Sequence, residues 1–150
     1  MNHEIPEYPN KIIAFVDILG FKEITKSLRD NPDFHKRVHY ALKQIKYIEE
    51  SINIKSSLNE IYEVSVFSDS IAISAEKNKI SELIWTVGWL QAQLLYVGIL
   101  TRGGISSGLL HHSKGIMYGE GFISAYRLEQ QSAIYPRVVV SNKILEFCKF

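Results

Sequence analysis

Apolar residues along this chain form two kinds of pattern: continuous runs, and stripes that recur every three or four positions. Residues 12–16 are an uninterrupted apolar and β-branched run, which predicts a strand at the centre of a sheet. Asn31 and Pro32, directly after Asp30, are a helix start signal. The apolar stripe that follows predicts a long amphipathic helix and consists of Phe34, Val38, Leu42, Ile45, Ile48 and Ile52.

The other elements follow from the same patterns and from the turn-forming residues between them. We expect a short helix over 22–28, two strands within 61–74 joined by a tight turn at 68–70, and a helix over 80–97. A strand over 100–110, bulged or bent at Gly103 and Gly104, comes next, and then a glycine-punctuated segment at 116–121. A helix over 122–131, a strand over 138–140 and a terminal helix, capped by Ser141 and ending at Phe150, complete the chain.

This order of elements predicts an α+β fold. It reads β-α-β-β-α-β followed by α-β-α, which is a ferredoxin-like βαββαβ core with an additional helix-strand-helix and helices flanking the sheet. No repeat, linker or low-complexity segment interrupts the 150 residues, so we expect a single domain over residues 1–150. The helical pattern continues to the last residue, so the sequence leaves open that this domain is incomplete at its C-terminus.

Composition and charge narrow the class of protein. The chain is 46% hydrophobic and 22% charged, as in ordinary globular proteins, and its net charge of +1 gives no basic field for a nucleic-acid partner. Its one cysteine, Cys148, excludes an internal disulfide and fits a reducing compartment. The first residues lack the apolar core of a signal peptide, so we expect a cytoplasmic protein.

Residues 83–100 form an 18-residue stretch without a charge, which is close to the length of a membrane span. Thr86, Gln91 and Gln93 interrupt it, and its end merges into a strand-like run. We therefore expect a buried helix that leads into a strand, and no membrane partner. A helix that is apolar on most faces buries more than one of them, which suggests a dimer interface.

Asp17 and Asp69 are the candidate functional residues with the clearest chemistry. Each lies at the edge of an apolar strand-like run, and the two are 52 residues apart on segments able to pair in one sheet. A carboxylate in such a place is costly to bury unless a cation compensates it. Together they predict a site for divalent metal, the kind of site that acts on phosphates. The alternatives are a strand-end acceptor for Asp17 and an ordinary turn residue for Asp69.

Four motifs in order resemble the class III nucleotide cyclases, which include the adenylyl and guanylyl cyclases. They are FVDILGF at 15–21, FSDSIA at 67–72, RGGISSG at 102–108 and YGEGFISAYRLE at 118–129. The resemblance implies that Asp17, Asp69 and the Ile18 carbonyl hold two Mg²⁺ or Mn²⁺ ions. It implies that the backbone amides of Leu19, Gly20 and Phe21 hold the phosphates.

The same resemblance assigns two arginines. Arg127 corresponds to the arginine that stabilises the transition state, and its alternative is a salt bridge to Glu120 or Glu129 on the same predicted helix. Arg102 begins the glycine-containing strand and would contact phosphate or base, with an exposed surface role as the alternative. In homodimers of this family the active site lies between subunits, with the metals on one chain and the arginine on the other.

Departures from the family motifs bear on the substrate. The lysine that reads purine in adenylyl cyclases corresponds to Ser65, its partner aspartate to Ile116, and the transition-state asparagine to Ile123. Ser65 and Ile116 would line a less polar base pocket, in which Ser65 either donates to a base edge or is simply tolerated on its strand. The motifs are most similar to the pyrimidine cyclases of the Pycsar anti-phage systems. That resemblance implies UTP or CTP as substrate, a cyclic nucleotide messenger in antiviral defence, and an effector that it activates.

Three other functions stay open: a degenerate cyclase-homology domain that binds nucleotide and dimerises, a purine cyclase, and a diguanylate cyclase. The G-G-[DE]-[DE]-F hairpin of diguanylate cyclases is absent, since FSDS occupies its place. The pair His35 and His39 has metal-ligand spacing without a third ligand, and Ser68 lacks the glycine-flanked elbow of a hydrolase. The sequence therefore favours a nucleotide cyclase over a hydrolase or a histidine-metal enzyme.

Overall fold

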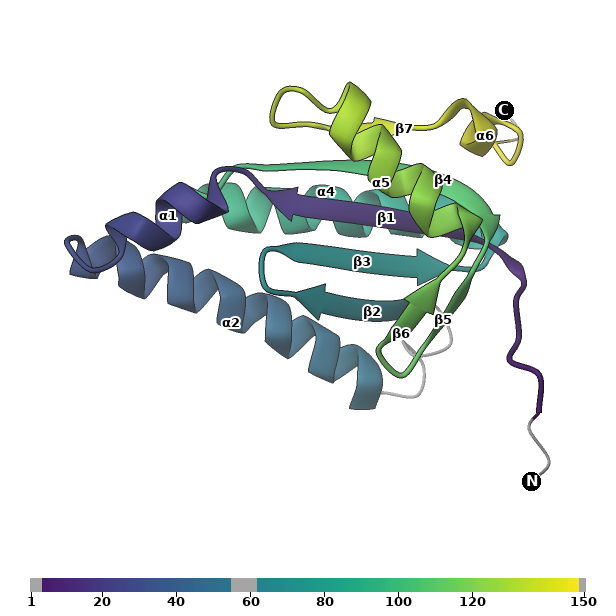
Figure 1. Cartoon of the computed structure of the whole chain (residues 1–150), viewed down its shortest axis with the longest axis horizontal. Helices are drawn as coiled ribbons and strands as arrows, with labels where there is room; N and C mark the ends of the chain where they lie inside the picture. The colour runs from purple at the N-terminus through teal and green to yellow at the C-terminus, as the bar shows by residue number, and fades with distance from the viewer. Residues whose placement is uncertain (1–3, 55–61, 149–150) are drawn as a thin grey trace.

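The computed structural model describes residues 4–54 and 62–148, and the side chains of 48–54 lie outside that description. A five-stranded sheet of order β2-β3-β1-β4-β7 forms its centre (Figure 1). The strands are β1 (Asn10–Ile18), β2 (Tyr62–Phe67), β3 (Ser70–Ala75), β4 (Thr101–Leu109) and β7 (Val138–Val140). The helices are α1 (Phe21–Ser27), α2 (Pro32–Ile54), α4 (Ile80–Tyr96), α5 (Glu120–Ser132) and α6 (Asn142–Leu145), with a 3₁₀ turn, η1 (Lys77–Lys79).

The topology confirms the predicted ferredoxin-like core. β1 lies between β3 and β4 and is antiparallel to both, and β2 pairs antiparallel with β3. The additional helix-strand-helix is α5, β7 and α6, with β7 parallel to β4 at the sheet edge. A separate two-stranded hairpin, β5 (His111–Ser113) and β6 (Ile116–Tyr118), follows β4. The Lys114 amide donates to Glu63 Oε1 at 3.0 Å, which fixes this hairpin to β2.

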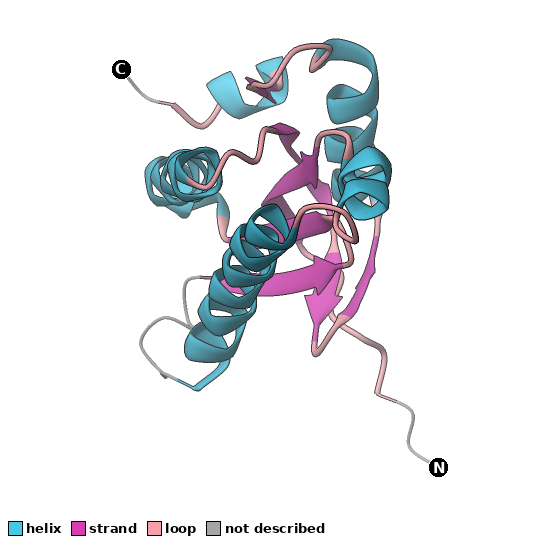
Figure 2. Cartoon of the chain, turned by 90° about the vertical axis from the view of Figure 1, so that its left-hand side faces the viewer, coloured by secondary structure: helices cyan, strands magenta, loops and turns pink. Residues whose placement is uncertain are grey.

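Both faces of β1 are covered, which explains its unbroken apolar sequence. Ile12, Ala14 and Val16 face the core beneath α2 and α4, while Ile13 and Phe15 face the smaller cluster beneath α5. All five side chains are buried. Figures 1 and 2 show α2 and α4 on one side of the sheet and α5 on the other. By strand alternation, Asp17 lies on the α5 side, together with Phe15.

The structure corrects the bulge that was one of two possibilities predicted for β4, and the predicted end of the terminal helix. β4 has no bulge at Gly103 and Gly104, because its register with β1 runs unbroken from Asn10 opposite Leu109 to Ile18 opposite Thr101. The glycines instead allow close approach: a Cβ on Gly104 would lie 2.5 Å from the carbonyl oxygen of Ala125 on α5. At the C-terminus, Ser141 caps the helix as predicted, accepting from the Lys143 amide at 3.3 Å. That helix, α6, nevertheless ends at Leu145 rather than at Phe150, which lies outside the described residues.

The charge-free stretch at 83–100 is part of α4 and the turn that leads into β4, as predicted, but the predicted burial holds for one face only. Leu83, Val87, Leu90 and Leu94 are buried, whereas Trp85, Leu95 and Tyr96 are exposed. Gly98 adopts a positive φ of 85° in this turn, and the chain then enters β4. No helix among the described residues has the length and apolar character needed to cross a bilayer. Ile48 and Ile52 of the predicted α2 stripe lie outside the described side chains.

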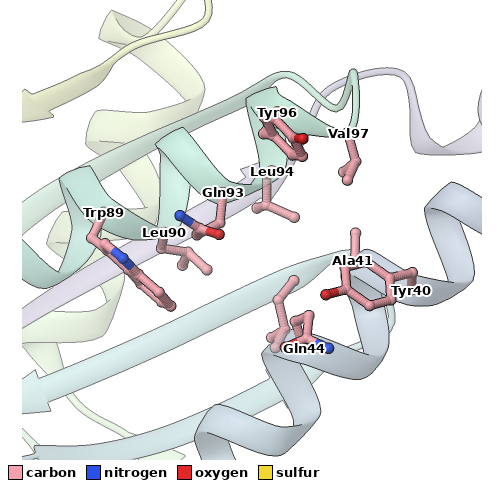
Figure 3. Close-up of a pocket in the computed structure, with 10 residues that line it drawn as sticks. Tyr40, Ala41, Gln44, Trp89, Leu90, Gln93, Leu94, Tyr96 and Val97 are labelled. Atoms are coloured by element: carbon pink, nitrogen blue, oxygen red, sulfur yellow. The ribbon is translucent and has the colours of Figure 1, made fainter.

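A cavity lies between α2 and α4, and Figure 3 shows Tyr40 and Gln44 on one of its sides with Trp89 and Gln93 on the other. The residues around it are Tyr40, Ala41, Gln44, Ile45, Trp89, Leu90, Gln93, Leu94, Tyr96 and Val97. None of them is a predicted site residue, so this cavity belongs to the helix packing rather than to the candidate site.

Candidate functional site

Asp17 and Asp69 come together where β1 ends and β2 turns into β3. The strand register places Asp17 opposite Ser70, the residue directly after Asp69. The Ile18 amide donates to the Asp69 backbone carbonyl at 2.9 Å, which fixes the turn against the end of β1. Ser68, in that turn, has a positive φ of 28°. The pairing of β1 with β3 therefore brings the two predicted carboxylates to one end of the sheet.

The Asp17 carboxylate has little positive charge to compensate it. Its Oδ1 accepts a hydrogen bond from Ser70 Oγ at 3.2 Å, and its Oδ2 lies 3.9 Å from Arg102 Nε. Burial raises the pKa of Asp17 above its ordinary value, and the nearby negative charges of Glu129 and Asp69 raise it further. The Ser70 hydroxyl and the Arg102 guanidinium act in the opposite direction. A cation bound between Asp17 and Asp69 would remove this electrostatic cost.

The donor set fits a hard divalent cation. Carboxylate and backbone carbonyl oxygens suit Mg²⁺ or Mn²⁺, which keep several coordination positions for water and phosphate. Among the described side chains, those of residues 4–47 and 62–148, no three or more of His, Cys, Asp or Glu are grouped so that they could hold a metal ion. Two carboxylates, of Asp17 and Asp69, together with the Ile18 carbonyl would leave several coordination positions of such an ion open.

Glu129 is a buried charged residue whose place in the site the sequence reasoning missed. Its side chain is 0% exposed, and it forms an ion pair with Arg102 through Oε1 and Nε. Its other oxygen accepts from Gln130 Nε2 at 2.6 Å. Arg102 therefore lies between Glu129 on α5 and Asp17 on β1, directly opposite Asp17 in the register. For Arg102, the alternative of an exposed surface role is wrong, and for Arg127 the alternative of a salt bridge to Glu129 is wrong.

The burial of Glu129 could have been predicted from its spacing of four residues from the small residues that precede it on α5. Gly121, Ala125 and Glu129 form the buried line of this helix. The first two are small and pack against Gly108 and Gly104 of β4. Glu129 lies on the same face of α5 as these two small residues. Because that face packs closely against β4, the Glu129 side chain is buried there.

The turn after β1 has two backbone amides free for a phosphate, not three. The Leu19 amide donates to the Leu100 carbonyl at 2.9 Å, so it is already engaged within the chain. Gly20 has a φ of 67° and precedes the first residue of α1, Phe21. Within the described part of the chain, no backbone carbonyl accepts from the Gly20 or Phe21 amide.

Ser65 lies under the β5–β6 hairpin rather than at an open surface. It is 3% exposed, and its Oγ lies 2.8 Å from His112 Nε2. The other ring nitrogen of His112 lies 2.7 Å from Ser74 Oγ, so one histidine links three strands. Burial lowers the pKa of His112 to about 4, and the positive charges of Lys11 and His111 lower it as well. In this structure the Ser65 hydroxyl faces His112, so it is not presented to a nucleotide base.

The other predicted residues lie at the surface. Arg127 is exposed on α5, two positions past the buried Ala125, and makes no ion pair with the described residues. Ile123 precedes it by one turn and is 46% exposed. Ile116, on β6, is 61% exposed. Figure 1 shows the β5–β6 hairpin near the β2 edge, away from the end where β1 finishes.

Comparison with solved structures identifies the fold. One structure of a bacterial light-regulated adenylyl cyclase matches with a TM-score of 0.67 and 20% identity, covering 94% of this chain and 80% of that chain. A second such structure matches with a TM-score of 0.62 and 19% identity, covering 99% of this chain and 48% of that chain. No protein-family model and no curated protein matches the sequence. The chain therefore has a class III cyclase-like fold, as the motif resemblance predicted.

Proposed function

We propose that this protein is a metal-dependent nucleotide cyclase. The observation that carries the proposal is the meeting of Asp17 and Asp69 at one end of a cyclase-like sheet. The reaction converts a nucleoside triphosphate to its 3′,5′-cyclic monophosphate. The ribose 3′-oxygen bonds to the α-phosphorus, the bond from that phosphorus to the β-phosphate oxygen breaks, pyrophosphate leaves, and the hydroxyl proton passes to solvent.

Two Mg²⁺ or Mn²⁺ ions would be held by Asp17, Asp69 and the Ile18 carbonyl. When bound, such ions lower the pKa of an attacking hydroxyl and neutralise the charge of the triphosphate. The amides of Gly20 and Phe21, which follow directly after β1, would orient phosphate oxygens at the same end of the strand.

Arg127 is proposed to act across a homodimer. Its exposed position on the outer face of α5 supports a role on the neighbouring subunit's nucleotide rather than on its own. There its guanidinium would stabilise charge on the reacting phosphate, and removing one such donor costs roughly 3–4 kcal/mol of transition-state stabilisation.

Mixing two inactive variants tests the shared site. Asp17→Ala and Arg127→Ala proteins should each lose product formation, and mixed dimers should recover part of it because one of their two sites is intact. Mixed dimers, verified by differential tagging, that recover no activity would contradict the shared site.

For the base, we propose a pyrimidine, UTP or CTP. Ser65 and Ile116 replace the two polar groups with which adenylyl cyclases read purine, and the Ser65 hydroxyl is engaged by His112. A buried polar group left unpaired costs about 1–3 kcal/mol, so a pocket without those groups has no basis for selecting adenine. The rival is a purine cyclase, which the adenylyl cyclase structures favour.

Product analysis separates these readings. We would incubate the protein with Mn²⁺ and ATP, GTP, CTP or UTP in separate reactions and identify cyclic mononucleotides by mass spectrometry, with Asp69→Ala as control. Cyclic UMP or cyclic CMP that is lost in Asp69→Ala supports the pyrimidine cyclase. Cyclic AMP or cyclic GMP would keep the cyclase and overturn the proposed base.

A catalytically inactive nucleotide-binding domain is the second candidate. Ile123 lies exposed one turn before Arg127, where the family carries an amide donor, and supplies no hydrogen bond. Nucleotide that raises the melting temperature only with divalent metal, without any product, would select this function.

The similarity to Pycsar cyclases extends the proposal to the cell. The protein would act in the cytoplasm in antiviral defence, and its cyclic nucleotide would activate an effector. Accumulation of that nucleotide after phage infection, absent in cells carrying Asp69→Ala, is the corresponding measurement.

A further inference from the structure

Arg102 lies between two carboxylates and is in closer contact with the one away from the candidate metal site. Its Nε is in ion-pair contact with Glu129 Oε1, whereas the Asp17 Oδ2 is 3.9 Å from the same nitrogen. Asp17 and Arg102 are opposite each other in the β1–β4 register, so their proximity does not depend on the position of α5. The position of Glu129 therefore decides how strongly Arg102 engages Asp17.

We propose that Glu129 is a positioning residue that keeps the Arg102 guanidinium from pairing fully with Asp17, so that Asp17 stays available to a divalent cation. This inference rests on the cation site of the proposed function. An arginine beside a lone carboxylate would form a short ion pair with it and compete with any metal for the same oxygens. A second carboxylate on the far side of the guanidinium removes that competition.

The charges of the cluster support this role. Asp17, Asp69 and Glu129 supply three carboxylates against the one guanidinium of Arg102, which leaves a formal excess of two negative charges. Without Glu129 the excess falls to one, and the remaining cationic side chain has only Asp17 opposite it. With Glu129 the cluster keeps the larger negative charge, which favours the binding of divalent cations.

The burial of Glu129 makes the arrangement rigid. Its side chain is 0% exposed, on the α5 line that packs on the glycines of β4. Leaving one partner of a buried ion pair alone is strongly unfavourable, so the contact between Glu129 and Arg102 persists as long as α5 is docked. The helix that carries Arg127 and the strand that carries Asp17 are thereby linked through a single guanidinium.

The test measures Mn²⁺ binding to the full chain by loss of the free-ion EPR signal, with Asp17→Asn defining the specific part. Glu129→Gln keeps the shape of the side chain and removes its charge. It should weaken Mn²⁺ binding about tenfold or more, because a guanidinium paired with a carboxylate lowers the affinity of that carboxylate for a proton by at least that factor. The matched control is Glu120→Gln, the same change at an exposed position of α5, and it should leave the affinity within about twofold.

A double variant distinguishes this role from a purely structural one. Removing the competing cation as well, in Arg102→Met/Glu129→Gln, should restore Mn²⁺ affinity to within about threefold of the unsubstituted protein, since a buried pair replaced by neutral side chains is tolerated. If Glu129→Gln does not fold, the double variant alone tests the inference. A folded double variant that binds Mn²⁺ about ten times more weakly than the unsubstituted protein overturns it. Equal affinity in folded Glu129→Gln and unsubstituted protein also overturns it.

Mn²⁺ affinity tests the positioning role of Glu129, and product formation tests the cyclase, so the two can fail separately. Unchanged Mn²⁺ affinity in Glu129→Gln, together with cyclic nucleotide from the unsubstituted protein, refutes the positioning role and leaves the cyclase. Weakened binding restored in the double variant, with no product from any nucleotide, supports the positioning role and refutes the cyclase.

Discussion

The buried ring of His112 should make the free energy of unfolding of this protein decrease as the pH falls below neutral. The ring is 4% exposed, and both its nitrogens are hydrogen-bonded by the serines of β2 and β3. In the neutral ring one nitrogen donates and the other accepts, so one serine accepts and the other donates. Protonation would place a charge in a buried site and near Lys11, which is why the folded protein resists it and the pKa of His112 is lowered. It would also convert both ring nitrogens to donors.

The size of the effect follows from the displaced pKa. The ring titrates at about 4 when folded and at 6.5 as a free side chain. The unfolded chain therefore takes up a proton below pH 6.5, while the folded protein does so only near pH 4. The stabilising contribution is complete above 6.5 and is lost as the pH falls towards 4. At roughly 1.4 kcal/mol per pKa unit, the full loss is about 3 kcal/mol, and about 2 kcal/mol of it is reached by pH 5.

Urea unfolding followed by tryptophan fluorescence, at several pH values between 7.5 and 5 and at fixed ionic strength, measures this loss. His112→Gln should have a lower free energy of unfolding at pH 7.5, because the hydrogen bonds to the serines weaken, and a flatter decline towards pH 5. His111→Gln, one residue earlier on the same hairpin, is the matched control and should keep the steep decline. Parallel pH curves for His112→Gln and the unsubstituted protein would refute the reasoning.

Further predictions concern the glycines of the core and the candidate metal site. Gly104→Ala should lower the melting temperature sharply, because its Cβ would lie 2.5 Å from a backbone carbonyl oxygen of α5. Gly88→Ala, in α4 with open space around it, should instead raise the free energy of unfolding by about 0.5–1 kcal/mol. Equal effects of the two changes would contradict the described packing. Asp17→Asn should raise the metal-free melting temperature at pH 7.5, since the structure disfavours the Asp17 charge, and should abolish any stabilisation by Mn²⁺. Stabilisation by Mn²⁺ that survives in Asp17→Asn would place the cation elsewhere.

Most of the fold could be predicted because the local patterns agree with the tertiary structure. The run at 12–16 is apolar at every position, and β1 is indeed buried on both faces. The predicted hairpin at 61–74 is the β2–β3 pair, and the predicted strand over 138–140 matches β7. The bulge predicted in β4 was wrong because a glycine in a strand can allow either a bulge or a close contact, and only the position of α5 distinguishes them. The terminal helix was predicted too long, since α6 ends at Leu145.

The candidate site was predictable only in part, for a related reason. Asp17 and Asp69 each border a strand, so pairing those strands is enough to bring them together. Arg102 and Ser65 were singled out, but their partners were not, since Glu129 and His112 reach them from α5 and β5. The sequence contains no local sign of these contacts beyond the spacing of small residues on α5.

Apart from the β5–β6 hairpin, the sequence by itself determined the order of elements, and it also determined the central place of β1 and the meeting of the acidic pair at one end of the sheet. Those properties depend on periodicity and strand pairing, which short stretches of chain encode. The tertiary structure alone decided that Glu129 is buried against Arg102, 27 positions away, and that His112 covers Ser65 and contacts its hydroxyl, 47 positions away. Such contacts depend on how a helix and a hairpin dock on the sheet. Docking is set by shape and charge summed over many residues, and no single segment contains that information.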